Sequence, residues 1–340
     1  MINSVNKVSL GCDPDRMLAI VIPAWRGRHL GAALQSLRLQ TDQRFRVYVG
    51  DDASGDDLLS LAKENGQGLD LVYHRFDENL GGRDLVAHWH RCIALTQDEP
   101  WIWLFSDDDV AEPECVASFF GAIQSGLGET DLLRFNLRII DDSGALVRTP
   151  RPNPLWESAE DFLRSILVGG GREWRAPEHI FSRQVYDQKG GFVSFPMALY
   201  TDLATWVEFA EKGGVKTLPG PHLRWRAHGS GISSGQRIQN RDALLAALNG
   251  FLVWLEQNVK RRSPDRSDRV CLKFILRELR RIQPSVPWGM AGLFTVRAKA
   301  FAPRSPFVGL RIIFAIGFSR ARHLPIVSRL LYWRYLRKIS

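Results

Sequence analysis

Cysteine is scarce in this chain, and its few cysteines form no recognisable pattern. The 340 residues contain four cysteines, which lie far apart and never in CxxC spacing. This pattern indicates neither a disulfide framework nor a zinc site, so we expect reduced thiols in a cytosolic protein. The N-terminal segment MINSVNKVSLGCDPD is polar and contains no apolar core, so we expect neither a signal peptide nor export.

Acidic residues are absent after Glu278, and this absence divides the chain by charge. From residue 260 onward, 19 lysines and arginines stand against three acids, whereas the part before it has 26 basic and 34 acidic residues. Aromatic and branched aliphatic residues alternate with arginine near the end, and no apolar run there reaches the ~18–20 residues of a membrane-spanning helix. This composition favours contact with an anionic membrane surface. A solvated helical pair with basic outer faces is the alternative.

Short apolar runs alternate with helix-like segments through the first 140 residues. Strands are predicted at residues 17–23, 45–50, 69–74, 101–105 and 131–136, and helices at residues 29–40, 57–64, 83–96 and 113–124. Such alternation with short connections predicts a largely parallel sheet covered by helices on both faces. Ligands of such sheets bind beyond the carboxyl ends of the strands. Past residue 140 the pattern is irregular, with helices expected at 199–212 and 243–259.

Polar or aromatic residues follow three of the predicted strands at such ends. The strand WIWLF runs into Asp107, Asp108 and Asp109 after one serine, and these like charges repel unless a cation or a solvated turn accommodates them. Trp25 follows the first strand, where it could pack on a planar base or lie in the core. Asp52 follows the second strand, where it could accept a hydrogen bond from a uracil ring or belong to an Asx turn.

A pair of glycines precedes the helix predicted after the third strand. In the turn Asn79–Gly82, exposed backbone N–H groups and the positive charge of Arg83 would suit a phosphate. An ordinary helix-start loop is the alternative. The chain has no GxxxxGK[ST] motif, so a P-loop nucleotide site is not expected. His88 and His90 are two residues apart on the predicted helix, face different ways and are poor joint metal ligands.

The order of these pieces along the chain is more informative than any one of them. IPAW at the first strand end, DDAS at the second, the NLGG turn and SDDD after the fourth strand together resemble glycosyltransferase family 2, the inverting enzymes of the GT-A fold. The resemblance covers residues 17–125 and continues more weakly in YTDLATWVEFAEKGG and RWRAHGSGISS. It implies an α/β, GT-A (Rossmann-like) fold with a mostly parallel sheet flanked by helices and a helical, basic C-terminal extension.

The resemblance also implies a division of the chain into domains. We expect a GT-A domain at residues 1–240, with a nucleotide-sugar-binding half at 17–125 and an acceptor-binding half at 126–240. Residues 241–340 would form a helical, basic region that associates with a membrane surface.

Carried over to matching positions, the family's site implies a role for nine residues. The nucleotide-sugar would be bound by Pro23, Trp25, Asp52, Arg83 and Asp107, a Mg²⁺ or Mn²⁺ ion by Asp108, Asp109 and His228, and the catalytic base would be Asp202. A carboxylate placed opposite the leaving group can take the proton of an acceptor hydroxyl. Helix capping by Asp202 and a hydrogen-bonded structural role of His228 are the alternatives.

Two positions depart from the family's pattern. Many members have Asp-x-Asp-Asp where this chain has Ser106 before the three aspartates, so the division of roles among the aspartates stays open. The acceptor-side pair is often Glu-Asp, whereas this chain has Thr201-Asp202, which keeps the base and changes its neighbour.

The sequence therefore predicts an inverting, metal-dependent transfer of a hexose from a UDP-sugar to a surface polysaccharide, a lipopolysaccharide or a lipid-linked oligosaccharide. The expected location is cytoplasmic, at the inner face of the plasma membrane. A rival, sugar-1-phosphate nucleotidyltransferase, requires an early Gly-rich loop with an Arg-Lys signature, and AWRGRHLG is too sparse for it. A second rival, nucleic-acid binding, predicts a basic patch spread over a recognised module. Because the positive charge is confined to the end of the chain, we expect no nucleic-acid partner.

Overall fold

Two compact units make up the part of the chain that the structure describes. The computed structural model describes residues 17–126, 128–227, 241–262, 268–282, 290–301 and 308–317. Unit 1 contains the chain up to residue 156, with 174–191 and 212–226, and unit 2 contains 157–173, 192–211 and the chain from residue 227 onward. These units do not coincide with the division expected at residue 240, because 157–173 and 192–211 group with the C-terminal helices. That a separate domain begins at residue 241 stays a prediction.

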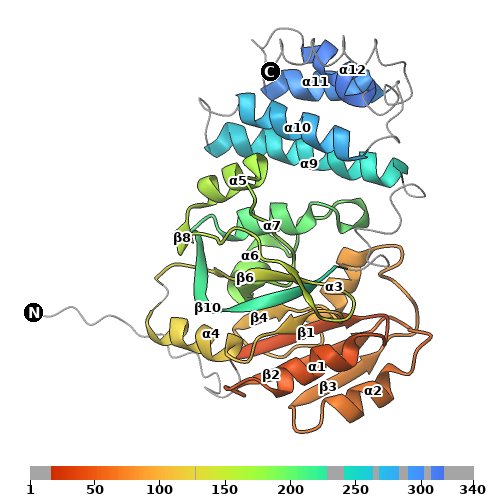
Figure 1. Cartoon of the computed structure of the whole chain (residues 1–340), viewed down its shortest axis with the longest axis vertical. Coiled ribbons are helices and arrows are strands. Elements are labelled where there is room, and N and C mark those ends of the chain that lie inside the picture. Colours follow the sequence, from red (N-terminus) through yellow and green to blue (C-terminus); the bar gives the residue numbers. More distant parts are fainter. Residues whose placement is uncertain are drawn as a thin grey trace, which may run out of the picture. The chain divides into compact units, whose positions relative to one another are not determined.

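Unit 1 is built around a large, mostly parallel sheet (Figure 1). Its strands are β1 (Leu18–Ala24), β2 (Phe45–Asp51), β3 (Leu71–Arg75), β4 (Trp101–Leu104), β5 (Val110–Ala111), β6 (Leu132–Ile140), β7 (Leu146–Arg148), β8 (Trp156–Glu157), β9 (His179–Ser182) and β10 (Val215–Arg226). The main order is β3-β2-β1-β4-β9-β6-β10-β5. The first four of these are parallel, as are β6 and β10, while β9 and β5 run antiparallel to their neighbours. The predicted α/β fold with a mostly parallel sheet is confirmed.

The helices of unit 1 explain why its central strands read as continuous apolar runs. They are α1 (Leu30–Arg38), α2 (Leu58–Asn65), α3 (Leu85–Ile93), α4 (Cys115–Gln124) and α6 (Arg183–Lys189). In Figure 1, α1 and α2 lie on one face of the sheet and α3 on the other, as right-handed crossovers require. Because both faces are covered, β1 is buried along its length apart from the partly exposed Pro23.

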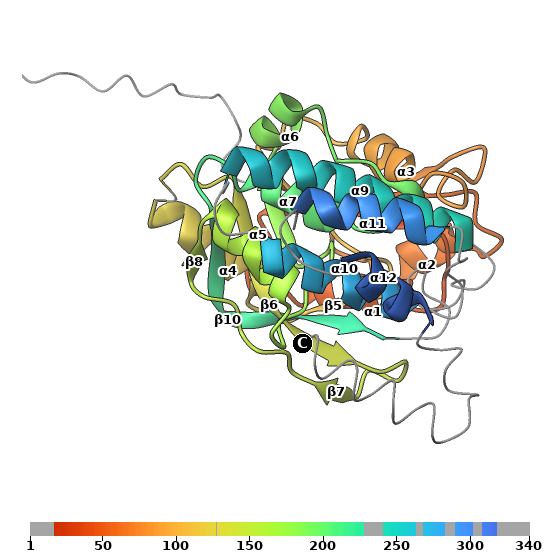
Figure 2. The ribbon, with the colours of Figure 1, turned by 90° about the horizontal axis from the view of Figure 1, so that it is seen from above.

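Unit 2 is helical in its described residues. It contains α5 (Ala159–Val168), the 3₁₀ helix η1 (Pro196–Ala198), α7 (Thr201–Phe209), α9 (Arg241–Arg262), α10 (Asp268–Ile282), α11 (Ala291–Phe301) and α12 (Val308–Gly317). Figure 2 shows α9 and α11 side by side, and the apolar side chains of Phe251, Phe274 and Phe294 are buried in this unit. The predicted helical C-terminal region is therefore present.

The sequence also led to expectations about the cysteines and about membrane-spanning helices. Cys92, Cys115 and Cys271 are buried, and Cys12 lies outside the described ranges. Within those ranges, no helix combines the length and the apolar character that crossing a bilayer requires.

Candidate functional site

The ends of three neighbouring strands in unit 1 carry the residues that the sequence singled out. Trp25 follows β1, Asp52 follows β2, and Asp107–Asp109 follow β4. The chain moves outward from β1 through β2 to β3 and then returns to β4 on the other side of β1. The sheet order therefore reverses between β1 and β4. Such a reversal point, at the carboxyl ends of the strands, is where open α/β sheets bind ligands.

Asp107 joins the ends of β1 and β4. Its Oδ2 accepts hydrogen bonds from the backbone N–H groups of Trp25, at 3.0 Å, and Arg26, at 3.3 Å. The indole of Trp25 is 47% exposed, with the Arg26 guanidinium 4.6 Å from the ring centroid. Trp25 is therefore not a core residue, and one of the two roles considered for it is wrong. Its exposed ring stands at the strand end, where a planar group can stack on it.

Asp109 is fully buried, and its two carboxylate oxygens differ in their contacts. Its Oδ1 accepts from the backbone N–H of Arg226, at the end of β10, at 2.8 Å. Its Oδ2 is also buried and has no hydrogen-bond partner among the residues that the structure describes. A buried anionic oxygen without a partner is costly, because burial removes the water that would otherwise solvate it. The half-buried Asp108 precedes it, and its Oδ1 accepts from the hydroxyl of Ser106.

Electrostatics disfavours three charged carboxylates at this strand end. Burial raises the pKa of Asp107 to about 7, and the charge of Asp108 adds to that effect. The same two causes hold the pKa of Asp109 well above its ordinary value. A cation would reverse this balance, because a nearby positive charge favours the ionised form of a carboxylate.

The donor atoms at this strand end suit a hard divalent cation. Carboxylate oxygens are the ligands that Mg²⁺ and similar ions prefer, and the unpartnered Oδ2 of Asp109 is such an oxygen. Among the described residues, no three His, Cys, Asp or Glu side chains converge as a preformed metal cage. Mg²⁺ is commonly held by one or two carboxylates, with substrate phosphates and water completing its shell. His228, the third predicted ligand, lies outside the described residues.

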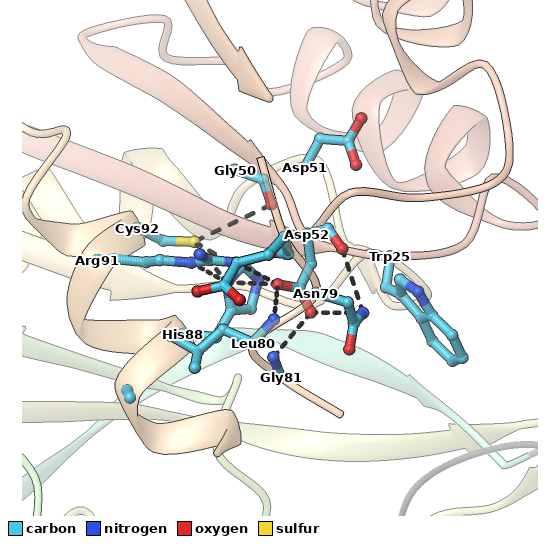
Figure 3. A network of polar contacts seen from close by, with 12 residues as sticks. Trp25, Gly50, Asp51, Asp52, Asn79, Leu80, Gly81, His88, Arg91 and Cys92 are labelled. Carbon is cyan, nitrogen blue, oxygen red and sulfur yellow. Dashed lines mark hydrogen bonds and ion pairs between the residues drawn. The ribbon is translucent and has the colours of Figure 1, made fainter. Parts of the chain in front are cut away.

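Asp52 holds the turn between β3 and α3. Its Oδ1 accepts from the backbone N–H of Leu80 at 2.8 Å, and its Oδ2 accepts from Gly81 N–H at 2.9 Å and from Asn79 Nδ2 at 2.9 Å (Figure 3). A Cβ atom on Gly81 would lie 2.8 Å from Asp52 Oδ2, so the close approach requires glycine there. A contact of Asp52 with a uracil ring stays a prediction.

Arg91 is a functional candidate that the sequence reasoning missed. Its guanidinium donates to Asp52 Oδ1 and, at 2.9 Å, to the carbonyl oxygen of Glu78, and it lies 3.9 Å from the centroid of the Phe76 ring. His88 accepts from Arg91 Nε at 3.1 Å through Nδ1, and burial lowers the pKa of His88 to about 4. The i, i+3 spacing of His88 and Arg91 on α3 is the one sequence feature that could have indicated their contact.

Arg83 stands apart from this buried network. Its side chain is 66% exposed, and Nη2 donates to Glu78 Oε2 at 2.6 Å in a surface ion pair. Its expected role near the diphosphate stays a prediction.

Arg226 lies within RWRAHGSGISS, but the sequence alone does not indicate its role. Besides its backbone bond to Asp109, its Nε donates to the carbonyl oxygen of Asp108 at 2.8 Å. Its Nη1 donates to the carbonyl oxygens of Asp141 and Asp142, both at 3.0 Å. Arg226 therefore fixes the backbone that carries the acidic residues. No local sequence pattern shows this contact, because the partners are more than 80 residues away along the chain.

Asp202 belongs to unit 2, in the first turn of α7. The N-cap residue of α7 is Tyr200, so the alternative that Asp202 is the capping residue is wrong. Asp202 is partly exposed, and its Oδ1 accepts from the N–H of Leu203 at 2.9 Å. A carboxylate in the first turn of a helix is stabilised by the helix dipole. Its role as the base stays a prediction.

Comparison with known proteins gives the family. No match was found among curated proteins. Two solved structures of S. aureus TarS 1–349 resemble this fold. The complex with UDP-GlcNAc has a TM-score of 0.54 and 12% sequence identity, and the match covers 89% of this chain and 92% of that chain. The complex with UDP has a TM-score of 0.52 at the same identity, with 90% of this chain and 92% of that chain covered. At this identity the likeness shows the fold alone. The model of "Glycosyl transferase family 2" matches residues 19–200, which is more than half of the chain, and the chain therefore belongs to that family.

Proposed function

We propose that this glycosyltransferase moves a hexose from a UDP-sugar, with inversion, to a surface polysaccharide, a lipopolysaccharide or a lipid-linked oligosaccharide. The observation that carries the proposal is the acidic strand end at the reversal point of the sheet, where the buried Oδ2 of Asp109 has no partner within the described part of the chain. Two solved structures of similar fold contain UDP-GlcNAc and UDP, which supports the choice of uridine nucleotide.

The donor would lie across the ends of β1, β2 and β4. Pro23 and the exposed Trp25 would flank the base, with Asp52 at its edge and Asp107 near the ribose. Arg83 would contribute charge near the diphosphate. This arrangement uses the aromatic face at the strand end for stacking and the neighbouring polar groups for orientation.

Asp108 and Asp109 would hold a Mg²⁺ or Mn²⁺ ion, with His228 as a further ligand. Such an ion, when bound, neutralises the negative charge that develops on a departing diphosphate. Asp202 would take the proton of the acceptor hydroxyl as that oxygen bonds to the anomeric carbon and the glycosyl–phosphate bond breaks. Attack from the side opposite the leaving group inverts the anomeric centre.

The basic C-terminal part would hold the enzyme at the inner, anionic face of the plasma membrane, where a lipid-linked acceptor is presented. The support is compositional: the chain has no acid after Glu278, and aromatic residues alternate with arginine.

Calorimetry and turnover together test the donor site and the base. We expect Asp108→Ala to abolish the Mn²⁺-dependent part of UDP binding, because it removes one of the two proposed carboxylate ligands. We expect Asp202→Asn to keep UDP affinity and to lower the turnover of a UDP-sugar by about 100-fold or more, the range of a lost general base. Asp242→Asn, an exposed change in the first turn of α9, is the matched control. Unchanged UDP affinity in Asp108→Ala would refute the metal role, and near-normal turnover in Asp202→Asn would remove Asp202 as the base.

A further inference from the structure

The chain segment that leads into Asp202 has an unusual backbone. Met197, Ala198 and Tyr200 have φ values of 58°, 52° and 65°, in the left-handed region that non-glycine residues rarely adopt. The left-handed region is unfavourable for residues with a Cβ atom, so this conformation persists only where the surroundings hold it. Tyr200 is also the N-cap residue of α7, and no side-chain hydrogen bond caps that helix. Contacts elsewhere in unit 2 must therefore stabilise the segment.

The side chain of Tyr200 provides one of these contacts, with α9 and α10. Its hydroxyl donates to Glu278 Oε2 on α10 at 3.0 Å. Its ring stacks on Phe251 of α9, with centroids 5.0 Å apart and an interplanar angle of 25°. Burial raises the pKa of Tyr200 well above its ordinary value, so the hydroxyl keeps its proton and remains a donor.

Glu278 is itself held in place by two arginines of its own helix. Arg281 Nε lies 3.0 Å from Glu278 Oε2, and Arg277 Nε donates to Glu278 Oε1 at 3.3 Å. Arg277 also donates to the carbonyl oxygens of Ile166, Leu167 and Val168 at the end of α5, at 3.1–3.2 Å. The acceptor of the Tyr200 hydroxyl is thus a buried carboxylate with a fixed position.

A second contact joins α9 to the start of the strained segment. The ring of Phe195 packs against Gly250, where an added Cβ atom would lie 3.0 Å from the ring. The backbone N–H of Phe195 donates to Thr201 Oγ1 at 3.2 Å, which ties the beginning of the segment to the first residue of α7. Residues of α9 and α10 therefore contact Phe195 and Tyr200, which precede Asp202.

We infer that Phe251 and Glu278 form a brace through which the C-terminal helices set the position of the Asp202 carboxylate for proton abstraction. Tyr200 and Glu278 are positioning residues, since neither is proposed to touch substrate. This inference rests on the proposed role of Asp202 as the base, and it gives the C-terminal helices a part in the reaction besides membrane contact.

Hydrogen exchange tests the brace without any substrate. In Tyr200→Phe, which removes only the hydroxyl, amides of residues 196–203 should exchange at least 10-fold faster than in the wild-type chain. Glu278→Gln should act in the same direction, and it provides a second variant if Tyr200→Phe folds poorly. Glu208→Gln is the matched control, because Glu208 accepts from Trp254 Nε1 at 3.1 Å near the other end of α7. If the amides of residues 196–203 exchange in Tyr200→Phe and Glu278→Gln no faster than in Glu208→Gln and the wild-type chain, the inference is overturned.

Release of UDP from UDP-GlcNAc, with water as the acceptor, tests the link to catalysis. Water would bond to the anomeric carbon, the glycosyl–phosphate bond would break, and Asp202 would receive the proton. We expect Tyr200→Phe to lower kcat at least 10-fold with calorimetric UDP affinity unchanged, and Glu208→Gln to leave both near wild type. In an Asp202→Asn background, Tyr200→Phe should have no further effect on kcat, because it acts through the missing carboxylate.

The outcomes separate the brace from the proposed base. Normal kcat in Tyr200→Phe, together with a large loss in Asp202→Asn, overturns the brace alone. Effects that multiply in the double variant also overturn it, since Tyr200 would then act independently of Asp202. Near-normal kcat in Asp202→Asn overturns the base assignment and, with it, the brace.

Discussion

At the scale of single residues, Asp52 shows how a buried charge is stabilised at a strand end. Its side chain is 2% exposed, and it receives backbone and side-chain donors from the turn as well as the guanidinium of Arg91. Breaking a buried ion pair from one side is costly, because the remaining charge stays buried without a partner.

Two arginines on the same stretch of chain give a direct comparison. We expect Arg91→Leu to lower the free energy of unfolding by about 3 kcal/mol, because Asp52 loses its buried partner. Arg83→Leu should change it by less than about 0.5 kcal/mol, because the Arg83–Glu78 pair is exposed. Urea unfolding of both variants measures the difference. Equal losses would contradict the assignment of Arg91 as the stabilising partner.

His88 should make the stability of unit 1 sensitive to pH. Its pKa is about 4 in the folded protein because of burial, against ~6.5 in the unfolded chain. Between these values only the unfolded chain takes up the proton, so stability is fully present above pH 6.5 and falls toward pH 4.

The pH effect of His88 is best measured as a difference between two proteins. Asp107, whose pKa is raised to about 7, acts with the opposite sign, so the wild-type profile alone is ambiguous. We expect the wild type to lose stability relative to His88→Gln between pH 7.5 and pH 4.5, by up to about 3 kcal/mol at ~1.4 kcal/mol per pKa unit. Parallel denaturation profiles of the two proteins would argue against it.

At the scale of elements, the turn between β3 and α3 depends on a glycine without a special backbone angle. Gly81 is required because the Asp52 carboxylate approaches the place where a Cβ atom would stand. At Gly121, in α4, no described residue outside its own turn of the helix lies within 4 Å of that place. Neither glycine has a positive φ angle, so the backbone conformation permits alanine at both positions. The two positions differ only in the space available for a Cβ atom.

Alanine substitution at these two glycines should have opposite effects. Gly81→Ala should destabilise the protein by about 1–3 kcal/mol, since a contact of 2.8 Å displaces a buried, hydrogen-bonded carboxylate. It should also weaken UDP binding if the turn borders the donor. Gly121→Ala should stabilise the protein by about 0.5–1 kcal/mol, the difference in helix propensity. Thermal unfolding and calorimetry measure both effects, and a neutral Gly81→Ala would refute the steric explanation.

At the scale of the whole molecule, positive charge is concentrated toward the C-terminal end of the sequence. The residues after 317 include six lysines and arginines and no acid. Each basic residue near an anionic surface contributes about 1 kcal/mol to binding, and salt reduces this contribution. The apolar residues Phe294 and Ile312 are buried in unit 2, so removal of α11 and α12 would disturb packing as well as charge.

A deletion after Gly317 removes these six basic residues and keeps α11 and α12 in the chain. We expect the full chain to sediment with vesicles that contain phosphatidylglycerol, less so at high salt, and the shortened chain to sediment several-fold less. Replacing the same six basic residues by glutamine in the full chain should reproduce the loss, which controls for the missing length. Equal sedimentation of the three proteins would refute the membrane contact.

The sequence by itself determined the first strands and helices of unit 1 and the place of its candidate site. Apolar runs and helical spacing are local properties, so β1, β2, β4, β6 and α1 lie within a few residues of their predicted positions. Because parallel strands bring their carboxyl ends to one edge, the order of the motifs also placed Trp25, Asp52 and Asp107–Asp109 at neighbouring strand ends.

Only the tertiary structure decided which hydrogen-bond and ion-pair partners the candidate side chains have. Asp52 and Arg91 are 39 residues apart, Asp109 and Arg226 are 117 apart, and Tyr200 and Glu278 are 78 apart. No local period links such pairs, because their contacts arise from the packing of strands and helices. Within the described ranges, the same packing leaves Asp109 Oδ2 without a hydrogen-bond partner and places α9 and α10 against the segment before Asp202. Neither feature has a signal in the sequence.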